Sequence, residues 1–533
     1  MELKRGISTW GILFASVSAT IGSGWLFGSL YTAKMAGPAA ILAWFIGAVA
    51  IIIVAMCFAE LSTMFPVSGG LSAFPLFTHG TTISFILGWV SWLAFIVIVP
   101  IEVLAVIQYA ATFIPSLMQK VADSDQLTPS GYIVAFFLTG ILLLINITSA
   151  RIMSKTSFYI TIWKLLVPCL LIILFLYKSH HFENLTSHGF APNGMQGLFA
   201  SLSVGGIILA YNGFQPGVAL AGETKNPQRS IPIAIVGSMV ICMFIYCFLQ
   251  FAFILAVPPE NLANGWSALT FAGQEGPFAG LAIIIGLAWF GIILYSDALI
   301  SPFGSGVIFM AASARASYSM SKSKLMPHFF QLLSKNAVPI PGLLVTFILS
   351  LVIFVCFDNW QEMASFYAAA ICLCNAVIPV TLFVMRKDFP NLPRPFKIFS
   401  YKIFSMLAFY ISNMLFYWCG WHIIWKLDIV ILIGIVMLAT MNYFNKSQLS
   451  IDLKASIWLA FYLIAFNIVS YLGSYGIGAL NIIANGYDFV WIAVISSISV
   501  LLASKYKLAN VKAEKLIQET LESIENEKTK LST

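Results

Sequence analysis

Gly22, Ser23 and Gly24 interrupt an apolar run that is long enough to cross a lipid bilayer. Glycine in a helix interior costs about 1 kcal/mol relative to alanine, and a backbone group freed in hydrocarbon costs more unless protein or water satisfies it. In return, the N-terminus of a half-helix offers N–H groups that suit a carboxylate, and unpaired carbonyls suit an ammonium group or a cation. The three residues therefore predict an unwound segment whose backbone binds charged groups.

A second interruption lies in the sequence GGIILAYNGFQPGVALAG, residues 205–222, where Asn212, Gly213, Pro216 and Gly217 break another apolar run. Paired breaks at corresponding places in two halves of a chain point to a transporter binding site built from an inverted repeat. A ligand that carries both a carboxylate and an ammonium group would satisfy both kinds of unpaired backbone group. The two breaks therefore predict a site for an amino acid.

The expected contacts divide by charge. The N–H groups of Ser23, Gly24 and Trp25 would bind the α-carboxylate, and backbone carbonyls would bind the α-ammonium group. These carbonyls belong to Thr20, Ile21, Leu209, Ala210 and Asn212, and the complete set of candidate substrate-binding residues also includes Gly22, Gly213 and Phe214. A packing role remains an open alternative, because small residues also let membrane helices approach one another closely.

Three charged side chains lie near the middle of apolar runs. Lys164 is eight residues beyond Thr156, about 12 Å into the bilayer at the rise of an α-helix, and burial there disfavours its charged form. Lys164 is therefore a candidate proton carrier, although snorkelling to the interface or a fixed structural hydrogen bond would also explain it. Glu102 and Asp297 are also mid-span, and either could bind a basic side chain, relay protons or pair with a polar neighbour.

These residues lie in a chain of 533 residues that is 60% hydrophobic and only 9% charged, with a mean hydropathy of +0.91. Soluble domains carry about 25% charged residues, so the composition indicates a polytopic membrane protein. A segment of about 20 apolar residues can span a bilayer. Fourteen such segments lie near residues 10–33, 38–62, 83–114, 130–150, 156–177, 196–221, 231–257, 277–311, 338–357, 361–385, 403–425, 428–444, 455–473 and 487–504.

The distribution of cations predicts the orientation, because cytoplasmic loops of membrane proteins are enriched in lysine and arginine. If the N-terminus is cytoplasmic, 23 of the 28 lysines and arginines lie on the cytoplasmic side and four lie opposite, with Lys164 within a span. Both termini are therefore expected in the cytoplasm. The net charge of +7 then reflects topology, and we expect no nucleic-acid partner.

The sequence gives no support for enzymatic or metal chemistry. The eight cysteines lie in or beside apolar runs without metal or redox spacing. There is no H-E-x-x-H motif, and no serine–histidine pair that the spans would bring together. We therefore expect no cofactor, no metal and no enzymatic activity. The tail from Lys505 onward alternates lysine and glutamate, which is typical of either a short surface helix or a disordered segment.

The sixth apolar segment carries the second break, so it is expected to begin a second set of five helices. The predicted fold is an all-α polytopic membrane protein with a core of five plus five helices in inverted repeats. This core is expected over residues 1–400, with repeats at about 6–178 and 196–386. About four additional transmembrane helices are expected over 401–504, and residues 505–533 would form a charged cytoplasmic tail.

Several motifs between residues 6 and 400 point to a known group of proteins. They are GSGWLFG (22–28), AELSTMFPVSGG (59–70), AYNGFQPGVALAGETKNPQRSIPIAI (210–235), ARASYSMSKSKLMPHFF (314–330) and VPIPG (338–342). In these motifs the chain resembles the amino acid-polyamine-organocation superfamily. Two stretches, GSGW and VPIEVLAVIQYA (99–110), are most similar to the bacterial branch that contains aspartate-proton symporters.

The resemblance implies a ten-helix, LeuT-like core that works by alternating access. In proton-coupled relatives a lysine on the fifth helix takes the place of a bound sodium ion. By that resemblance Lys164 is expected to reach the carbonyl region of Gly22 and also Ser301. Many exchangers of the superfamily carry a gating glutamate where this chain has Gln215, and a neutral amide cannot titrate at that position.

The residues and the resemblance together predict an amino acid permease of the cell (inner) membrane that moves its substrate with protons. Glu102, Gln215, Trp289 and Asp297 are candidates for gating or relay. The rings of Trp25, Phe214 and Trp289 could close over the substrate or simply pack. Two alternatives remain open: an exchanger of one amino acid for another, and a receptor or channel that keeps the fold without pumping. The resemblance favours an acidic substrate, but no arginine lies at mid-membrane depth to bind a second carboxylate.

Overall fold

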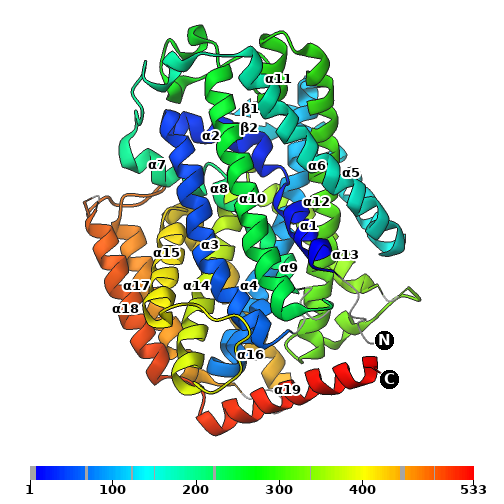
Figure 1. Ribbon diagram of the computed structural model, residues 1–533, viewed down its shortest axis with the longest axis vertical. Helices are drawn as coiled ribbons and strands as arrows, with labels where there is room; N and C mark the ends of the chain where they lie inside the picture. Colours follow the sequence, from blue (N-terminus) through cyan, green and yellow to red (C-terminus); the bar gives the residue numbers. More distant parts are fainter. Residues whose placement is uncertain are drawn as a thin grey trace.

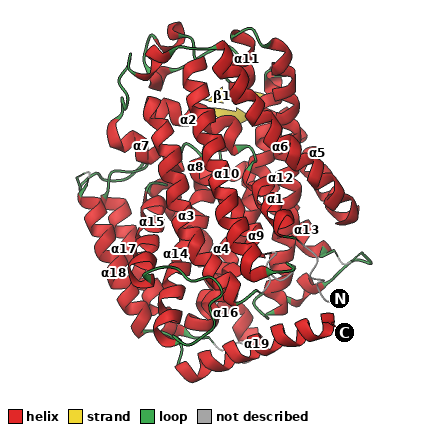
Figure 2. Cartoon of the chain, in the orientation of Figure 1, coloured by secondary structure: helices red, strands yellow, loops and turns green. Residues whose placement is uncertain are grey.

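The computed structural model describes residues 8–66, 70–121, 124–148, 150–219, 224–336, 338–444, 451–484 and 486–532. Helices make up nearly all of its regular structure, and Figure 2 shows a short β-hairpin at one end. Figure 1 shows the long helices running side by side between this end and the opposite one, where α19 lies across the bundle. The chain is an all-α polytopic membrane protein, as the sequence predicts.

The first part of the bundle holds six helices. They are α1 (Thr9–Thr20), α2 (Gly24–Ala36), α3 (Ala40–Met64), α4 (Gly70–Ala111), α5 (Pro129–Thr148) and α6 (Ala150–Lys178). The hairpin between α4 and α5 pairs β1 (Met118–Val121) with β2 (Ser124–Leu127) in antiparallel fashion, and Met118 lies opposite Leu127.

The second part holds eight helices. They are α7 (Gly194–Ser203), α8 (Ile207–Tyr211), α9 (Gln215–Ala219), α10 (Pro227–Ala256), α11 (Pro277–Ile284), α12 (Ala288–Lys322), α13 (Ile340–Cys356) and α14 (Trp360–Asp388). Short 3-10 helices lie at Gly37–Ala39, Pro115–Leu117, Phe182–Leu185, Asn212–Phe214 (η4), Pro259–Leu262, Trp266–Ala268 and His328–Gln331.

The C-terminal part adds α15 (Tyr401–Tyr417), α16 (Trp421–Phe444), α17 (Leu453–Leu472), α18 (Tyr487–Lys505) and α19 (Asn510–Ser532). The tail is therefore helical over α19, the first of the two states that its composition allowed. Ala513 and Ile517 on α19 are buried, and Lys512 forms an ion pair with Asp452 at 2.7 Å. These contacts hold α19 against the rest of the bundle.

Ten described helices are long and apolar enough to cross a membrane, or eleven if the bent pair α7 and α8 with η4 counts as one span. The fourteen segments expected from the sequence exceed this number because several of them form shorter helices. The first segment is divided between α1 and α2, and the segments near 338–357 and 403–425 form α13 and α15, each of 17 residues.

Two expected segments have different bounds in the structure. The segment expected at 277–311 is divided, because Gly286 adopts a φ of +80° between α11 and α12. The spanning helix is therefore α12, which continues to Lys322. The segment expected at 83–114 begins earlier, at Gly70, and bends at Gly80, where φ is +79°. Glycine adopts such left-handed angles without the strain that a Cβ would cause.

The interior and the periphery of the bundle are distinguished by burial. In their most apolar windows α4 and α14 are 94% buried, whereas α5 is only 28% buried. α4 packs against α12 and α14, and α10 packs against α1 and α3, so the first and second parts interlock. The outward faces carry exposed apolar side chains such as Leu144, Ile173 and Leu432. An apolar outer surface of this extent suits a bilayer.

A buried ion pair joins the ends of α3 and α14. Arg386 donates to both carboxylate oxygens of Glu60, from Nε at 2.6 Å and from Nη2 at 2.5 Å. The backbone N–H of Ile398 donates to the same carboxylate at 2.8 Å, and Arg394 Nε lies 3.5 Å from it. Bidentate pairing with additional donors offsets the desolvation of the buried charges. The loop after α14 is thereby tied to α3.

Candidate functional site

The first break lies where the glycines predict it. α1 ends at Thr20, α2 begins at Gly24, and the residues between them leave the α-helical pattern. A Cβ on Gly22 would lie 2.4 Å from Glu102 Oε1, and a Cβ on Gly24 would lie 3.0 Å from that of Ala210. The glycines therefore do more than loosen a helix, because they let α4 and α8 approach the unwound backbone.

The second break differs in detail from its prediction. A bend of 47° separates α7 from α8 with η4, and Gly206 adopts a φ of +87° there. The expected break near Asn212 and Gly213 is a turn of 3-10 helix, η4, between α8 and α9. The sixth span is therefore interrupted twice, and the bend at Gly206 precedes the predicted break.

The two breaks touch one another through their backbones. A Cβ on Gly213 would lie 2.1 Å from the backbone nitrogen of Thr20 and 2.2 Å from its Cα. Any side chain at position 213 would therefore push the two spans apart. Glycine at this position explains how two broken helices cross at one point, which a pair of intact helices with side chains would not allow.

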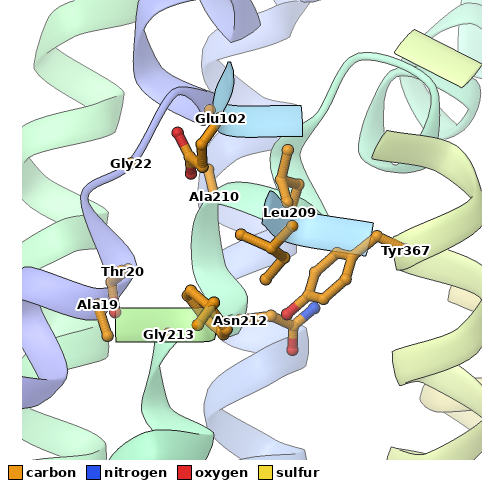
Figure 3. Close-up of a pocket in the computed structure, with 12 residues that line it drawn as sticks. Ala19, Thr20, Gly22, Glu102, Leu209, Ala210, Asn212, Gly213 and Tyr367 are labelled. Atoms are coloured by element: carbon orange, nitrogen blue, oxygen red, sulfur yellow. The ribbon is translucent and has the colours of Figure 1, made fainter. Parts of the chain in front are cut away.

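A small cavity of about 10 Å³ lies at this crossing. Figure 3 shows its lining, which includes Thr20 and Gly22 from the first break, Ala210 and Gly213 from the second, and Glu102 from α4. A space of this size holds about one water molecule. A ligand as large as an amino acid fits only if the walls move apart.

Side chains already contact the backbone groups that the sequence assigns to a ligand. The N–H of Ser23 donates to Glu102 Oε2 at 2.9 Å. The hydroxyl of Tyr246, on α10, donates to the carbonyl of Thr20 at 3.0 Å and lies 3.4 Å from the carbonyl of Ala210. One carboxylate and one hydroxyl thus contact a donor of the first break and a carbonyl of each break. Nothing in the sequence distinguishes Tyr246 from other aromatic residues of apolar runs.

Replacement of Tyr246 by phenylalanine tests the second of these contacts. Loss of the hydroxyl leaves the carbonyls of Thr20 and Ala210 without this donor, which we expect to lower the stability of the protein by about 1 kcal/mol. Thermal unfolding of the purified variant in detergent measures the effect. Tyr177→Phe, at an exposed position of α6, is the matched control, and equal melting temperatures for the two variants would contradict the assignment.

Lys164 is fully buried and joins three helices. Its Nζ donates to the carbonyl of Ser18, on α1, at 3.0 Å and to Ser305 Oγ, on α12, at 2.7 Å. The expected contact with Ser301 is replaced by one with Ser305, one turn further along α12. The contact on the first span is likewise made to Ser18 and not to the Gly22 region.

Asp297 and Glu102 share an electrostatic environment with Lys164, because each carboxylate interacts with its ammonium group. Ser301 donates to Asp297 Oδ1 at 2.6 Å, whereas the described contact of Lys164 on α12 is with Ser305. Two acids and one base therefore lie near the first break without forming a direct ion pair within hydrogen-bond distance in the described residues.

Three amide side chains form a buried cluster beside η4. Gln215 Nε2 donates to Asn212 Oδ1 at 3.0 Å and lies 3.5 Å from Asn375 Oδ1, on α14. Within the part of the chain that the structure describes, Gln215 Oε1 has no hydrogen-bond partner although it is buried. Asn375 was not singled out by the sequence, because a lone asparagine in an apolar run carries no spacing signal.

The aromatic candidates have different places. Phe214 packs against Phe58, and Trp25 packs against Phe278, so both rings are buried beside the breaks. Trp289 is 55% exposed near the start of α12, so the structure does not bring it to the site.

Trp360, at the start of α14, is an aromatic residue of the site that the sequence analysis missed. Its Nε1 donates to Ser23 Oγ at 3.2 Å, and its ring lies 2.7 Å from the position of a Cβ on Gly206. Trp360 therefore bridges the first break and the bend at Gly206. Among the described residues, no group of three or more His, Cys, Asp or Glu side chains could hold a metal ion.

Comparisons with known proteins identify the relatives of this chain. A family model described as amino acid permease matches residues 7–466. The chain is 36% identical over 513 residues to the glutamate/serine transporter AimA of Bacillus subtilis (strain 168), covering 95% of this chain and 94% of the relative. It is 34% identical over 513 residues to the aspartate-proton symporter of the same organism, covering 95% and 97%.

A more distant relative is the branched-chain amino acid permease BcaP of Bacillus subtilis (strain 168), which is 24% identical over 452 residues, 82% of this chain and 92% of the relative. The family match covers most of the chain, including both broken spans and the helices that pack around them. The chain therefore belongs to the amino acid permease family.

Proposed function

We propose that this protein is a secondary active amino acid transporter that works as an amino acid–proton symporter. The observation that carries the proposal is the crossing of two broken spans at Thr20 and Gly213, around backbone groups held by Glu102 and Tyr246. Broken helices at corresponding places of two repeats are typical of transporter binding sites. The relatives named as a glutamate/serine transporter and an aspartate-proton symporter support this class of substrate.

The substrate would bind through its main-chain groups. The N–H groups of Ser23, Gly24 and Trp25 lie at the N-terminal end of α2, where the helix dipole favours an anion such as the α-carboxylate. The carbonyls of Thr20 and Ala210 would accept hydrogen bonds from the α-ammonium group, together with those of Ile21, Leu209 and Asn212. The small volume of the cavity, about 10 Å³, fits alternating access, because an amino acid would enter only when one side of the crossing opens.

Lys164 would couple a proton to this movement. Its contacts connect α6 and α12 to α1, the half-helix that ends at the first break. A charged ammonium group has three hydrogen-bond donors and is costly to bury, so loss of its proton would weaken the tie to Ser18 and free α1 to move. The alternation of the two forms would make the position of α1 depend on proton binding.

The membrane arrangement follows from the charge distribution. We propose the cell membrane as the location, with both termini in the cytoplasm, because lysine and arginine are enriched in the loops on that side. The division into a transport core over residues 1–400, with inverted repeats at about 6–178 and 196–386, additional helices over 401–504 and a tail over 505–533 belongs to the same proposal.

Uptake into proteoliposomes tests the function. Purified protein in vesicles without internal amino acid is exposed to an inward proton gradient, and uptake of labelled L-aspartate, L-glutamate and L-serine is measured. We expect at least one of them to accumulate above its external concentration, and a proton ionophore to abolish the accumulation. Uptake that occurs only with amino acid preloaded inside the vesicles would favour an exchanger. Equilibration without accumulation would contradict secondary active transport.

A further inference from the structure

We propose that the Glu102 carboxylate is a built-in occupant of the subsite for the substrate's α-carboxylate, so that an amino acid binds only by displacing it. The inference rests on the proposed function and adds a residue that regulates the same backbone site. One contact motivates it: the Ser23 N–H donates to Glu102 Oε2 at 2.9 Å. The donor that an incoming carboxylate needs is therefore already held by a side chain of the protein.

The fit of Glu102 leaves no room for a second carboxylate. The side chain is only 4% exposed, and its Oε1 lies 2.4 Å from the position of a Cβ on Gly22. Figure 3 shows Glu102 beside the unwound loop at Gly22, at the edge of the cavity. Two carboxylates at one N–H would also repel each other. Substrate and Glu102 are therefore competitors for the same position.

The surroundings determine where a displaced carboxylate goes. Ionisable groups face Glu102 from four neighbouring elements: Lys164 on α6, Tyr246 on α10, Tyr367 on α14 and, through Lys164, Asp297 on α12. Lys164 is the only cation among them. Its partner Ser305 Oγ lies 3.1 Å from the position of a Cβ on Gly22, so the ammonium group is one side chain away from the break.

Release of Glu102 couples substrate binding to protons. A buried carboxylate that loses its N–H donor must either gain a proton from the aqueous side to which the cavity opens or pair with Lys164 in its protonated form. Both outcomes require one proton on the Glu102–Lys164 pair when substrate is bound. By linkage, protons and amino acid then favour each other's binding. Substrate affinity should accordingly increase when the competing negative charge is removed.

Other roles of Glu102 do not predict tighter binding when its charge is removed. If Glu102 bound the ammonium group of the substrate, its neutralisation would weaken binding. If Glu102 were only a structural cap of the break, its neutralisation would weaken binding or leave it unchanged. Tighter amino acid binding after neutralisation is expected only if the Glu102 carboxylate competes with the substrate. Its removal then increases the fraction of molecules whose site is free to bind.

The test is the affinity of L-serine for the purified protein and for Glu102→Gln, measured by isothermal titration calorimetry in detergent at one pH. L-Serine has a single carboxylate, so its binding reports on one subsite, and L-aspartate and L-glutamate are measured alongside. We expect the variant to bind roughly tenfold more tightly, the ratio typical for loss of one charge-assisted hydrogen bond of the competitor. Unchanged or weaker binding would overturn the inference.

Asp297→Asn is the matched control, because it neutralises another buried carboxylate near Lys164 that does not contact the break. It should not increase the affinity, and an equal increase in both variants would also overturn the inference. Glu102→Asp, which keeps the charge but shortens the reach to Ser23, provides a second variant if Glu102→Gln does not fold, and it too should bind more tightly.

If neither variant can be purified, infrared difference spectra of the unmodified protein decide the question. Addition of L-serine labelled with carbon-13 in its carboxylate must shift an unlabelled carboxyl band of the protein, and an unchanged band would contradict displacement. Failure of the unmodified protein to bind any of the three amino acids would overturn the proposed function as well. Binding to it without tighter binding in the variants would overturn the inference alone.

Discussion

Lys164→Met should fold, insert into the membrane and lose uptake driven by a proton gradient. Methionine has a similar length and no charge, so it fills the buried position while removing the donors to Ser18 and Ser305. Lys164 is fully buried. Bulk water therefore cannot take the place of the ammonium group in the variant. Coupling between two sites is typically worth about 5-fold to 150-fold, and we expect accumulation in proteoliposomes to fall by that order.

Lys178→Met is the control for this prediction, because it removes a lysine from the exposed end of the same helix, α6. That variant should accumulate substrate as the unmodified protein does. Equal proton-driven accumulation by Lys164→Met and Lys178→Met would remove Lys164 from the mechanism. A snorkelling or purely structural lysine would instead affect the melting temperature of the protein without changing its dependence on the gradient.

Gly213→Ala should separate the two breaks and strongly weaken amino acid binding. The new methyl group would lie 2.1 Å from the backbone nitrogen of Thr20 and 2.3 Å from its hydroxyl oxygen. Because most of this contact is with backbone, a side-chain rotation cannot relieve it. Overpacking costs about 3 kcal/mol in such cases, which corresponds to roughly a hundredfold loss of affinity if the crossing must form for binding.

Gly140→Ala is the matched substitution for this second prediction. Gly140 lies on α5, and a Cβ there would meet only Phe347 at 4.0 Å, an ordinary contact distance. It should bind amino acids normally in a thermal-shift assay, in which bound ligand raises the melting temperature by mass action. A Gly213→Ala protein that shows the same ligand-induced shift would place the substrate elsewhere.

Much of the fold could be predicted from the sequence because a bilayer imposes strong rules. Apolar segments of fixed length and the paired glycine clusters identified the class of protein and the first break. The ends of individual helices were less predictable where a single glycine changed the direction of the chain. Gly286 divides a continuous apolar run between α11 and α12, and hydropathy alone cannot reveal a left-handed backbone angle at one residue.

The site was predicted less completely than the fold. Which side chains meet there depends on how each helix is rotated about its axis and how far it is shifted along the bundle. Lys164 was identified because burying a charged side chain in the bilayer costs free energy. Its contact on α12 is nevertheless Ser305 and not Ser301. These serines are four residues apart on one face of α12, so an offset of one turn between neighbouring helices decides which serine the lysine reaches. The sequence contains no information that fixes such an offset directly.

The site residues that the sequence did not predict were missed for one common reason. Tyr246, Trp360 and Asn375 lie on α10 and α14, far in sequence from both breaks, and meet the site only through packing. In an apolar helix, an aromatic or amide side chain has no spacing that distinguishes a binding role from a packing role. Gly206 was likewise not predicted to bend the span, because a glycine in an apolar run does not reveal a left-handed backbone angle.

The central claim is that the backbone of two broken spans binds an amino acid. The most direct test is an experimental structure of the purified protein with a bound L-amino acid that it transports. We expect ligand density at the crossing, with the carboxylate on the N–H groups of Ser23 and Gly24, the ammonium group near the carbonyls of Thr20 and Ala210, and Glu102 displaced. Density at a different place, or a continuous α-helix through residues 20–25, would contradict it.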